Sequence, residues 1–203
     1  MKRLLAGAAA LMVCSVSVAM ADNVPQLTLS TAKPATAVST VAPSTAAPMT
    51  ANASYEPVTN YSGSLAAEVS SYYVNKNSSR VVDGTRAVDG DYDSAWNANS
   101  RWDGEWIRVY VPNGKTYEIS GFAIANGYWH TSKTYKNNPR VRTADVYADD
   151  EYVTTVDLED QNGVIQYIEF DAPVYANGIK LVIRDVYKGA KYKDLAITEI
   201  TLF

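Results

Sequence analysis

The sequence predicts an all-β protein whose folded part is one antiparallel β-sandwich, preceded by a signal peptide and a disordered linker. Three observations support the sandwich. Short segments rich in Val, Ile and Tyr recur from about residue 64 onward, turn dipeptides with Gly or Asn separate them, and no segment there shows a 3.6-residue apolar period. About 140 residues in roughly eight strands are enough for one such sandwich.

The N-terminus has the three parts of a secretory signal. Lys2 and Arg3 form a short basic region, residues 4–18 are apolar, and Ala19 and Ala21 provide the small residues of a cleavage site. The apolar run is too short for a good membrane span. We therefore predict that residues 1–21 are a cleaved signal and that the protein is exported to the periplasm, the cell envelope or the medium. A retained N-terminal anchor is the alternative.

Residues 22–62 differ from the rest of the chain in composition. Residues 30–59 consist mostly of Ala, Thr, Ser, Pro and Val, with hardly a charge. Such a segment has few large side chains to bury, so it cannot offset the entropy lost on ordering. We predict a disordered, partly extended linker that spaces the domain of residues 63–203 from a membrane, wall or partner. A dispensable tail is the alternative.

Cysteine content and charge exclude several classes of protein. Cys14 is the only cysteine and lies inside the predicted signal, so the mature chain would have no disulfide, thiolate metal site or Cys nucleophile. The net charge is −4, and without Lys2 and Arg3 it is −6. An acidic protein with no basic block is a poor candidate for binding nucleic acid. No second apolar stretch could span a membrane.

The strands of the domain follow from alternation and from the turns between them. In residues 105–111 the apolar side chains of Ile107, Val109 and Val111 fall on one face. The turn signals are Gly and Asn residues that tolerate positive φ. The other predicted strands are residues 119–125, 141–148, 152–156, 164–170, 179–186 and 196–203. Trp96 and Trp106 are expected in the core, because large aromatic side chains dominate burial.

Asp89, Asp91 and Asp93 lie within five residues on a turn beside Gly90. Oxygen ligands that close together on a tight loop suit a calcium ion. Such an ion would be structural, because no neighbouring group could act as a general base. The alternative is that Asp89 and Asp93 cap turns by bonding backbone amides.

Residues 126–140 follow one apolar strand and precede another, and they are predicted to form a long loop dense in aromatic, amide and cationic side chains. Such a loop on a rigid sandwich is a common place for function, and this mixture of side chains is typical of sugar binding. Trp102 lies in a second polar loop, residues 97–104, and is expected to be exposed there. Alternatively, Asn126 and Asn138 satisfy the loop's own backbone, with Tyr128 and Tyr135 packed beneath it. The predicted ligand contacts are Asn126, Tyr128, Trp129, Tyr135, Asn138, Arg140 and Trp102.

Several stretches resemble one family. Residues 87–96, Ala-Val-Asp-Gly-Asp-Tyr-Asp-Ser-Ala-Trp, resemble the DG-x-x-x-T-x-W signature of discoidin, or coagulation-factor type C, domains, and residues 196–200 resemble their last strand. Residues 126–128, 135–140 and 186–189 are similar to a narrower branch, the glycan-binding translocation domain of secreted bacterial NAD-glycohydrolase toxins. The resemblance covers the whole predicted domain and includes no counterpart of the toxin's catalytic domain.

This resemblance implies a galactose-binding-like jelly roll that binds carbohydrate through loops at one end. It also implies a structural calcium held by Asp89, Asp91, Ser94 and Glu199. Two positions depart from the family: Ser94 stands where Thr is usual, and His130 stands where the branch often has Lys. The second departure bears on the identity of the ligand.

An enzymatic function finds little support. His130 is the only histidine, and the chain has neither a G-x-S-x-G motif nor a Gly-rich phosphate loop. Paired carboxylates for glycoside hydrolysis would have to come from Asp149, Asp150, Glu159 and Asp160, which lie in turns where acidic residues are usually solvated. We therefore expect a non-catalytic exported module that binds a glycan. The alternative is a module that docks onto a protein partner.

Overall fold

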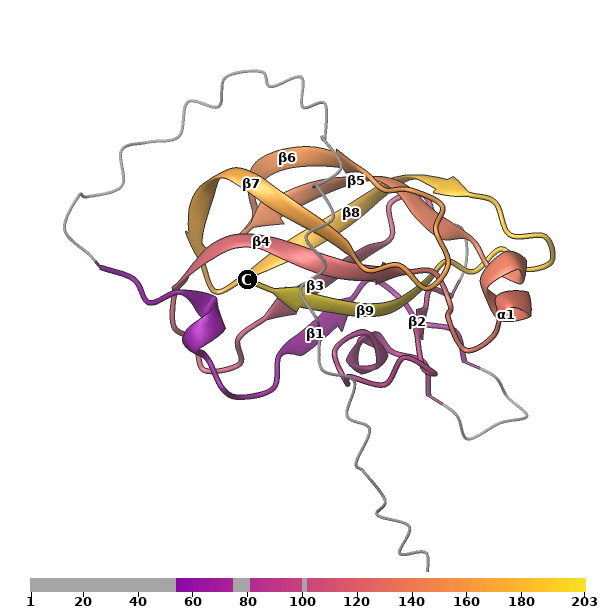
Figure 1. Ribbon diagram of the computed structural model, residues 1–203, viewed down its shortest axis with the longest axis horizontal. Coiled ribbons are helices and arrows are strands. Elements are labelled where there is room, and N and C mark those ends of the chain that lie inside the picture. The colour runs from indigo at the N-terminus through magenta and orange to yellow at the C-terminus, as the bar shows by residue number, and fades with distance from the viewer. Residues whose placement is uncertain (1–53, 75–80, 100–101) are drawn as a thin grey trace, which may run out of the picture. The chain divides into compact units, whose positions relative to one another are not determined.

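A computed structural model of the chain describes residues 54–74, 81–99 and 102–203. The predicted signal and residues 22–53 of the predicted linker lie outside these ranges. The described chain forms two antiparallel sheets packed as a sandwich (Figure 1). No helix within the described ranges has the length and apolar character needed to cross a membrane.

The larger sheet has five strands and the smaller has four. The larger sheet contains, in spatial order, β1 (Ala66–Val69), β3 (Trp106–Tyr110), β8 (Gly178–Tyr187), β5 (Arg140–Ala148) and β6 (Glu151–Asp157). The smaller contains β2 (Trp96–Asn97), β9 (Ala196–Leu202), β4 (Tyr117–Asn126) and β7 (Gln166–Ala176). Three short helices complete the described part of the chain: η1 (Val58–Asn60), η2 (Gly84–Ala87) and α1 (Ser132–Asn137).

The core between the sheets follows the alternation of the sequence. Ile107 and Val109 of β3 are buried, and β8 pairs beside them with Ile179 and Leu181 facing the same core. Trp96 is fully buried, and its indole N–H donates to the carbonyl of Ser71 (2.8 Å). The predicted core positions are therefore confirmed, except that Trp106 is only half-buried.

Tight turns join strands where Asn, Asp and Gly occur in the sequence. Asp149 and Asp150 connect β5 to β6 with φ of 43° and 72°. Both angles lie in the left-handed region, which a two-residue hairpin turn of the primed type requires. The Asp149 carboxylate also accepts from the backbone N–H of Asn177 (2.8 Å), which joins this turn to the β7–β8 hairpin.

The domain begins before residue 63. Val58 is only 4 % exposed and belongs to the core, and the ring of Tyr61 packs edge-on against Tyr117. The backbone N–H of Glu118 donates to the carbonyl of Glu56 (2.9 Å), which ties this segment to β4. The predicted linker therefore extends too far, because its last residues supply apolar side chains that close one end of the core.

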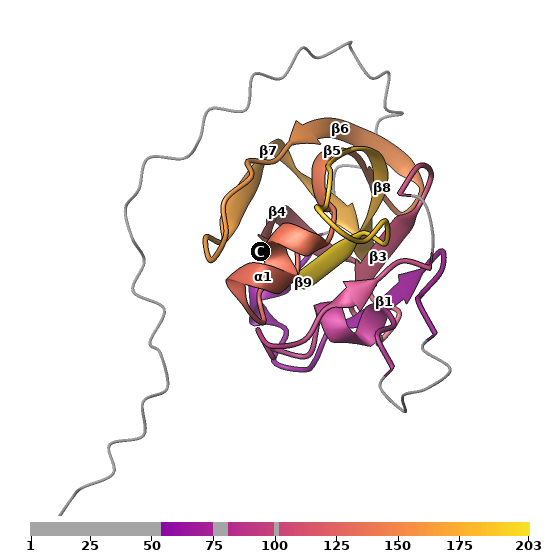
Figure 2. The same ribbon diagram turned by 90° about the vertical axis from the view of Figure 1, so that its right-hand side faces the viewer.

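Residues 126–140 are not one long loop. Asn126 ends β4, Arg140 begins β5, and α1 lies between them. Thr131 and Thr134 form a reciprocal capping box that starts this helix. Six residues are too few to show a helical apolar period, so the sequence pattern did not reveal α1. The helix and the β8–β9 turn lie at the same end of the sandwich, at the right of Figure 1 and towards the viewer in Figure 2.

Truncating Trp96 tests the core. We expect Trp96→Ala to lower the free energy of unfolding by about 3–5 kcal/mol, because the buried indole leaves a cavity. Tyr152→Ala is the control, since Tyr152 is 50 % exposed and such substitutions usually change stability by about 0.5 kcal/mol or less. Urea denaturation measures both variants. Similar stability losses in the two would contradict the described core.

Candidate functional site

A groove of about 500 Å³ opens among the loops at the α1 end of the sandwich. This volume lies within the range typical of small-molecule sites. Three parts of the chain form it: the β2–β3 loop, the residue before β5, and the end of β8 with the β8–β9 loop. The lining residues are Trp102, Asp103, Pro139, Val186, Lys188, Gly189, Tyr192 and Lys193. Trp102 is partly buried and packs against the core, whereas Tyr192 is 42 % exposed.

The C-terminus of α1 holds the β8–β9 loop in place. The last carbonyls of a helix lack partners within the helix, and here they accept from the loop. The N–H of Ala190 donates to the carbonyl of Lys136 (2.9 Å), and the N–H of Tyr192 donates to that of Asn137 (2.9 Å). Gly189 permits this approach, because a Cβ there would lie 2.3 Å from the carbonyl oxygen of Asn137. The groove wall is thus fixed by backbone contacts.

Arg140 lies buried beneath the same loops. Its guanidinium makes a two-pronged ion pair with Asp160, with Nε 3.0 Å from Oδ1 and Nη2 bonded to Oδ2. Nη1 donates to the carbonyls of Asn138 (3.2 Å) and Lys188 (3.4 Å). The Tyr135 hydroxyl donates to Asp160 (2.7 Å) from the other side. Arg140 therefore joins the β6–β7 loop, α1 and the β8–β9 loop.

This cluster shifts the pKa values of its members. Burial raises the pKa of the Tyr135 hydroxyl, and its hydrogen bond to Asp160 raises it further. Partial burial alone would raise the pKa of Asp160, but hydrogen bonds from Arg140 and Tyr135 outweigh it and hold that pKa below its usual value. Both groups therefore keep their ordinary neutral-pH charge states, the carboxylate ionised and the phenol protonated.

Four predicted ligand contacts are instead buried parts of this scaffold. Arg140 and Tyr135 belong to the cluster with Asp160. Asn126 forms two hydrogen bonds with the backbone of Val141 (2.7 and 2.9 Å). The Asn138 amide donates to the carbonyl of Thr134 (2.8 Å). The structure thus shows the alternative predicted for the two asparagines: their side chains form hydrogen bonds with nearby backbone groups.

The remaining predicted aromatic contacts divide between two places. Trp102 lines the groove. Trp129 lies outside it: its indole N–H donates to the carbonyl of Asn126 (2.8 Å) and its ring stacks on Tyr92, with centroids 5.7 Å apart. Tyr128 is half-buried beside His130, 6.0 Å between ring centroids. Sequence reasoning missed Lys188, Tyr192 and Lys193 as candidate contacts: residues 186–189 were used only as a turn signal and for the family resemblance, and residues 190–193 carried no signal.

The aspartate turn brings its predicted calcium ligands together. The Ser94 hydroxyl donates to Asp89 (2.9 Å), and Glu199 accepts from the N–H of Gly90 (3.2 Å). Burial, together with the charges of Asp89 and Asp91, raises the pKa of Glu199 to about 7. Oxygen-only donors around surplus negative charge fit a hard cation such as calcium.

The same turn also contains the hydrogen bonds to backbone N–H groups that are expected if these aspartates only stabilise the turn. Asp89 accepts from the N–H of Asp91, and Asp91 accepts from the N–H of Asp93, both at 2.9 Å. In the described ranges, no group of three or more His, Cys, Asp or Glu side chains has a metal-holding arrangement. A cation here would therefore also need hydroxyl and carbonyl oxygens, such as those of Ser94 and Arg86.

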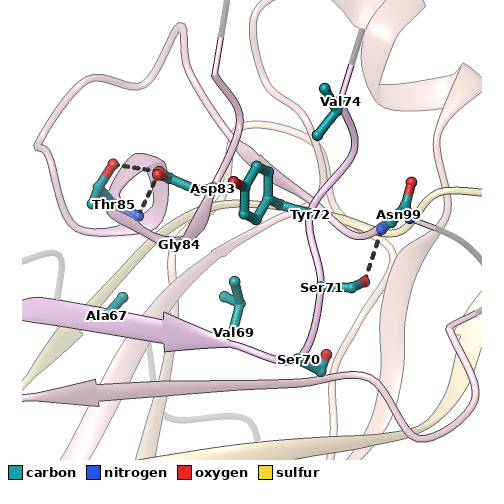
Figure 3. Close-up of a pocket in the computed structure, with 10 residues that line it drawn as sticks. All are labelled: Ala67, Val69, Ser70, Ser71, Tyr72, Val74, Asp83, Gly84, Thr85 and Asn99. Carbon is teal, nitrogen blue, oxygen red and sulfur yellow. Dashed lines mark hydrogen bonds between the residues drawn. The ribbon is translucent and has the colours of Figure 1, made fainter.

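A second cavity, of about 410 Å³, lies beside β1 and the start of η2 (Figure 3). Several of its polar groups already have hydrogen-bond partners in the protein. The Ser71 hydroxyl donates to Glu105 (2.7 Å) and accepts from the N–H of Asn99 (3.0 Å), and Asp83 caps Thr85 (3.2 Å). Fewer polar atoms are therefore left for a ligand, which makes the groove of Trp102 and Tyr192 the stronger candidate.

The chain is similar to known proteins in both sequence and fold. Residues 60–203 match the family described as the NAD glycohydrolase translocation F5/8 type C domain. No curated protein sequence matches the chain.

Solved structures with this fold include three Clostridium perfringens modules of the CBM32 group, which the chain overlays with low sequence identity. The family 32 CBM of NanJ, in complex with galactose, is 20 % identical at a TM-score of 0.52, over 68 % of this chain and 92 % of that one. CpGH89CBM32-5, in complex with GalNAc-β-1,3-galactose, is 18 % identical at 0.51, over 74 % and 99 %. CBM32-3 of a family 31 glycoside hydrolase is 17 % identical at 0.52, over 69 % and 90 %.

Removing the Asp160 charge tests the buried cluster. We expect Asp160→Asn to lower the free energy of unfolding by about 2 kcal/mol near pH 7, because it leaves Arg140 buried without its counter-charge. Since the folded-state pKa of Asp160 lies below its usual value, the carboxylate stabilises the fold above about pH 4. Its contribution declines as acid protonates the folded carboxylate. The stability difference measured between wild type and variant should therefore shrink below pH 4; a constant difference would contradict this.

Calcium titration tests the aspartate turn. If the ion binds only the folded chain, it stabilises by about 2.7 kcal/mol at a free concentration of one hundred times Kd. The melting temperature should rise with calcium and fall with chelator in the wild type. It should not respond to calcium in Glu199→Gln, which loses one proposed ligand. Identical wild-type melting curves in calcium and in chelator would contradict calcium binding, and the aspartates would then only stabilise the turn.

Proposed function

Because this chain belongs to the family of NAD glycohydrolase translocation F5/8 type C domains, we propose that it is an exported, non-catalytic module that binds carbohydrate in the groove of Trp102 and Tyr192. One observation carries the proposal: aromatic and polar side chains from separate loops line a single preformed groove. Export rests on the predicted signal of residues 1–21, and the module would act at a cell surface or in the envelope.

The groove offers the contacts that a sugar needs. The exposed ring of Tyr192 can stack on the C–H face of a pyranose, while Trp102 supplies an apolar floor. Asp103, Lys188 and Lys193 can bond the sugar hydroxyls. Because α1 holds the β8–β9 loop by backbone hydrogen bonds, little ordering is left for the moment of binding, and affinity is gained at lower entropic cost.

The carboxylates considered for catalysis have other partners. Asp160 is bound to Arg140 and Tyr135. Asp150 pairs with Lys180, and Asp149 accepts from the backbone N–H of Asn177. Glu159 lies on the exposed surface, bonded to Gln161. The geometry thus supports structural roles for three of the four and supports binding over catalysis.

Replacing Tyr192 tests this function. Galactose and GalNAc-β-1,3-galactose, the ligands in two of the Clostridium modules, are the first probes for a wider glycan panel. We expect Tyr192→Ala to reduce binding by about 2 kcal/mol while changing stability by about 0.5 kcal/mol or less. Titration calorimetry and thermal melts measure the two effects.

Tyr152→Ala is the matched control, because Tyr152 is similarly exposed but lies beside the β5–β6 turn. It should bind as the wild type does. Equal binding by all three proteins would place the ligand elsewhere on the domain. No binding of the wild type to any glycan, together with a specifically retained protein, would favour the docking alternative.

A further inference from the structure

The lysines of the domain are concentrated at the groove end. Of the seven lysines that the structure describes, five occupy α1 and the β8–β9 loop. They are Lys133, Lys136, Lys188, Lys191 and Lys193, and all five are exposed. The chain as a whole is acidic, with a net charge of −4. Most of the described lysines therefore lie at one end of an acidic protein, and we call these five residues the end lysines.

The end lysines differ from the other cations in their pairing. All five arginines in the described ranges form ion pairs with carboxylates, and so does Lys180, which pairs with Asp150. Within the same ranges, none of the end lysines has a carboxylate partner within ion-pair distance. Outside this end, Lys115 in the β3–β4 turn is the one other described lysine or arginine without such a partner. The end lysines are therefore the one group of neighbouring cations in the described ranges whose charges are left available to a ligand.

The end lysines lie where a ligand of the groove would meet them. Lys188 and Lys193 line the groove itself. The Lys191 ammonium lies 4.9 Å from the ring centroid of Tyr192. The hydrogen bond from Ala190 to Lys136 holds the loop against α1, so the charges of both segments share one end of the sandwich (Figure 2). Asp103 is the one acidic residue among those that line the groove.

We infer that the natural ligand of this groove is an anionic polysaccharide, one that carries carboxylate or sulfate groups. The inference rests on the proposed carbohydrate-binding function and names its substrate class. The aromatic groove takes one sugar ring, and the ammonium groups of Lys188 and Lys193 pair with its acidic substituent. The remaining end lysines attract neighbouring acidic sugars of the same chain.

A polysaccharide fits this end better than other polyanions do. Nucleic acid affinity depends on neutralising many closely spaced phosphates, and the acidic remainder of the domain would repel a long duplex. A flat anionic membrane would contact the end lysines but has no group that fills a groove of about 500 Å³ beside Trp102. A polymer of acidic sugars has both features: one sugar ring can occupy the groove, and the single charges spaced along the polymer can pair with the end lysines.

The experiment compares two forms of one polymer. Titration calorimetry of the full chain uses polygalacturonate and its fully methyl-esterified form, with a neutral galactan as a third probe. We expect polygalacturonate to bind at least about fivefold more tightly than the ester, because each exposed ion pair contributes modestly. This preference should weaken as NaCl rises from about 0.05 to 0.5 M, since salt screens exposed charges.

Lysine variants connect the preference to the groove. The double variant Lys188→Gln/Lys193→Gln should lose most of the preference for the acidic polymer and keep its melting temperature. Lys115→Gln, an equally exposed change in the β3–β4 turn, should behave as the wild type. A double variant that keeps the full preference would overturn the assignment of these two lysines.

The outcomes separate this inference from the proposed function. Equal affinity for the acid and the ester, still abolished by Tyr192→Ala, would overturn the anionic ligand and leave carbohydrate binding intact. No binding of any glycan would overturn both. Binding only to phosphatidylserine vesicles, with no response to polygalacturonate, would replace the polysaccharide with a membrane surface.

Discussion

The groove end of this domain depends on one ion pair, between the buried guanidinium of Arg140 and the more exposed carboxylate of Asp160. A buried guanidinium is costly unless its donors are satisfied, and here a carboxylate and two carbonyls satisfy them. These acceptors come from the β6–β7 loop, the end of α1 and the β8–β9 loop. Displacement of any one of these loops would remove an acceptor from the buried guanidinium, so Arg140 constrains all three together.

Because Arg140 holds these loops together, the short loops can form a groove of defined shape. The mature chain is predicted to contain no cysteine, so disulfides would not hold the loops. Backbone hydrogen bonds from the β8–β9 loop to α1 do so instead, and Gly189 allows the close approach that they need. Among the described residues, no buried side-chain nitrogen or oxygen lacks a hydrogen-bond partner. Each buried polar group therefore contributes to order, and the exposed groups are left for contact with a ligand.

The charged side chains are divided in a similar way, into those that form ion pairs and those that are exposed without an ion-pair partner. The arginines pair with acidic residues. Each exposed pair contributes little to stability, and its two opposite charges largely cancel. Within the described residues the end lysines have no such partners, so their positive charge is left exposed at one end of an acidic protein. The groove and the end lysines lie together because the β8–β9 loop supplies Tyr192 of the groove and three of the five lysines.

The sequence by itself determined the strands, the Trp96 core and the family, because alternation and turn residues act locally and repeat along the chain. It could not determine which polar side chains would face a ligand. Asn126, Arg140 and Tyr192 all lie at strand ends or in loops, yet only Tyr192 lines the groove. That outcome depends on contacts between residues far apart in sequence, such as Arg140 with Asp160 and Tyr192 with Asn137. Only the tertiary structure decided it, since burial of a polar group depends on which distant partner satisfies it.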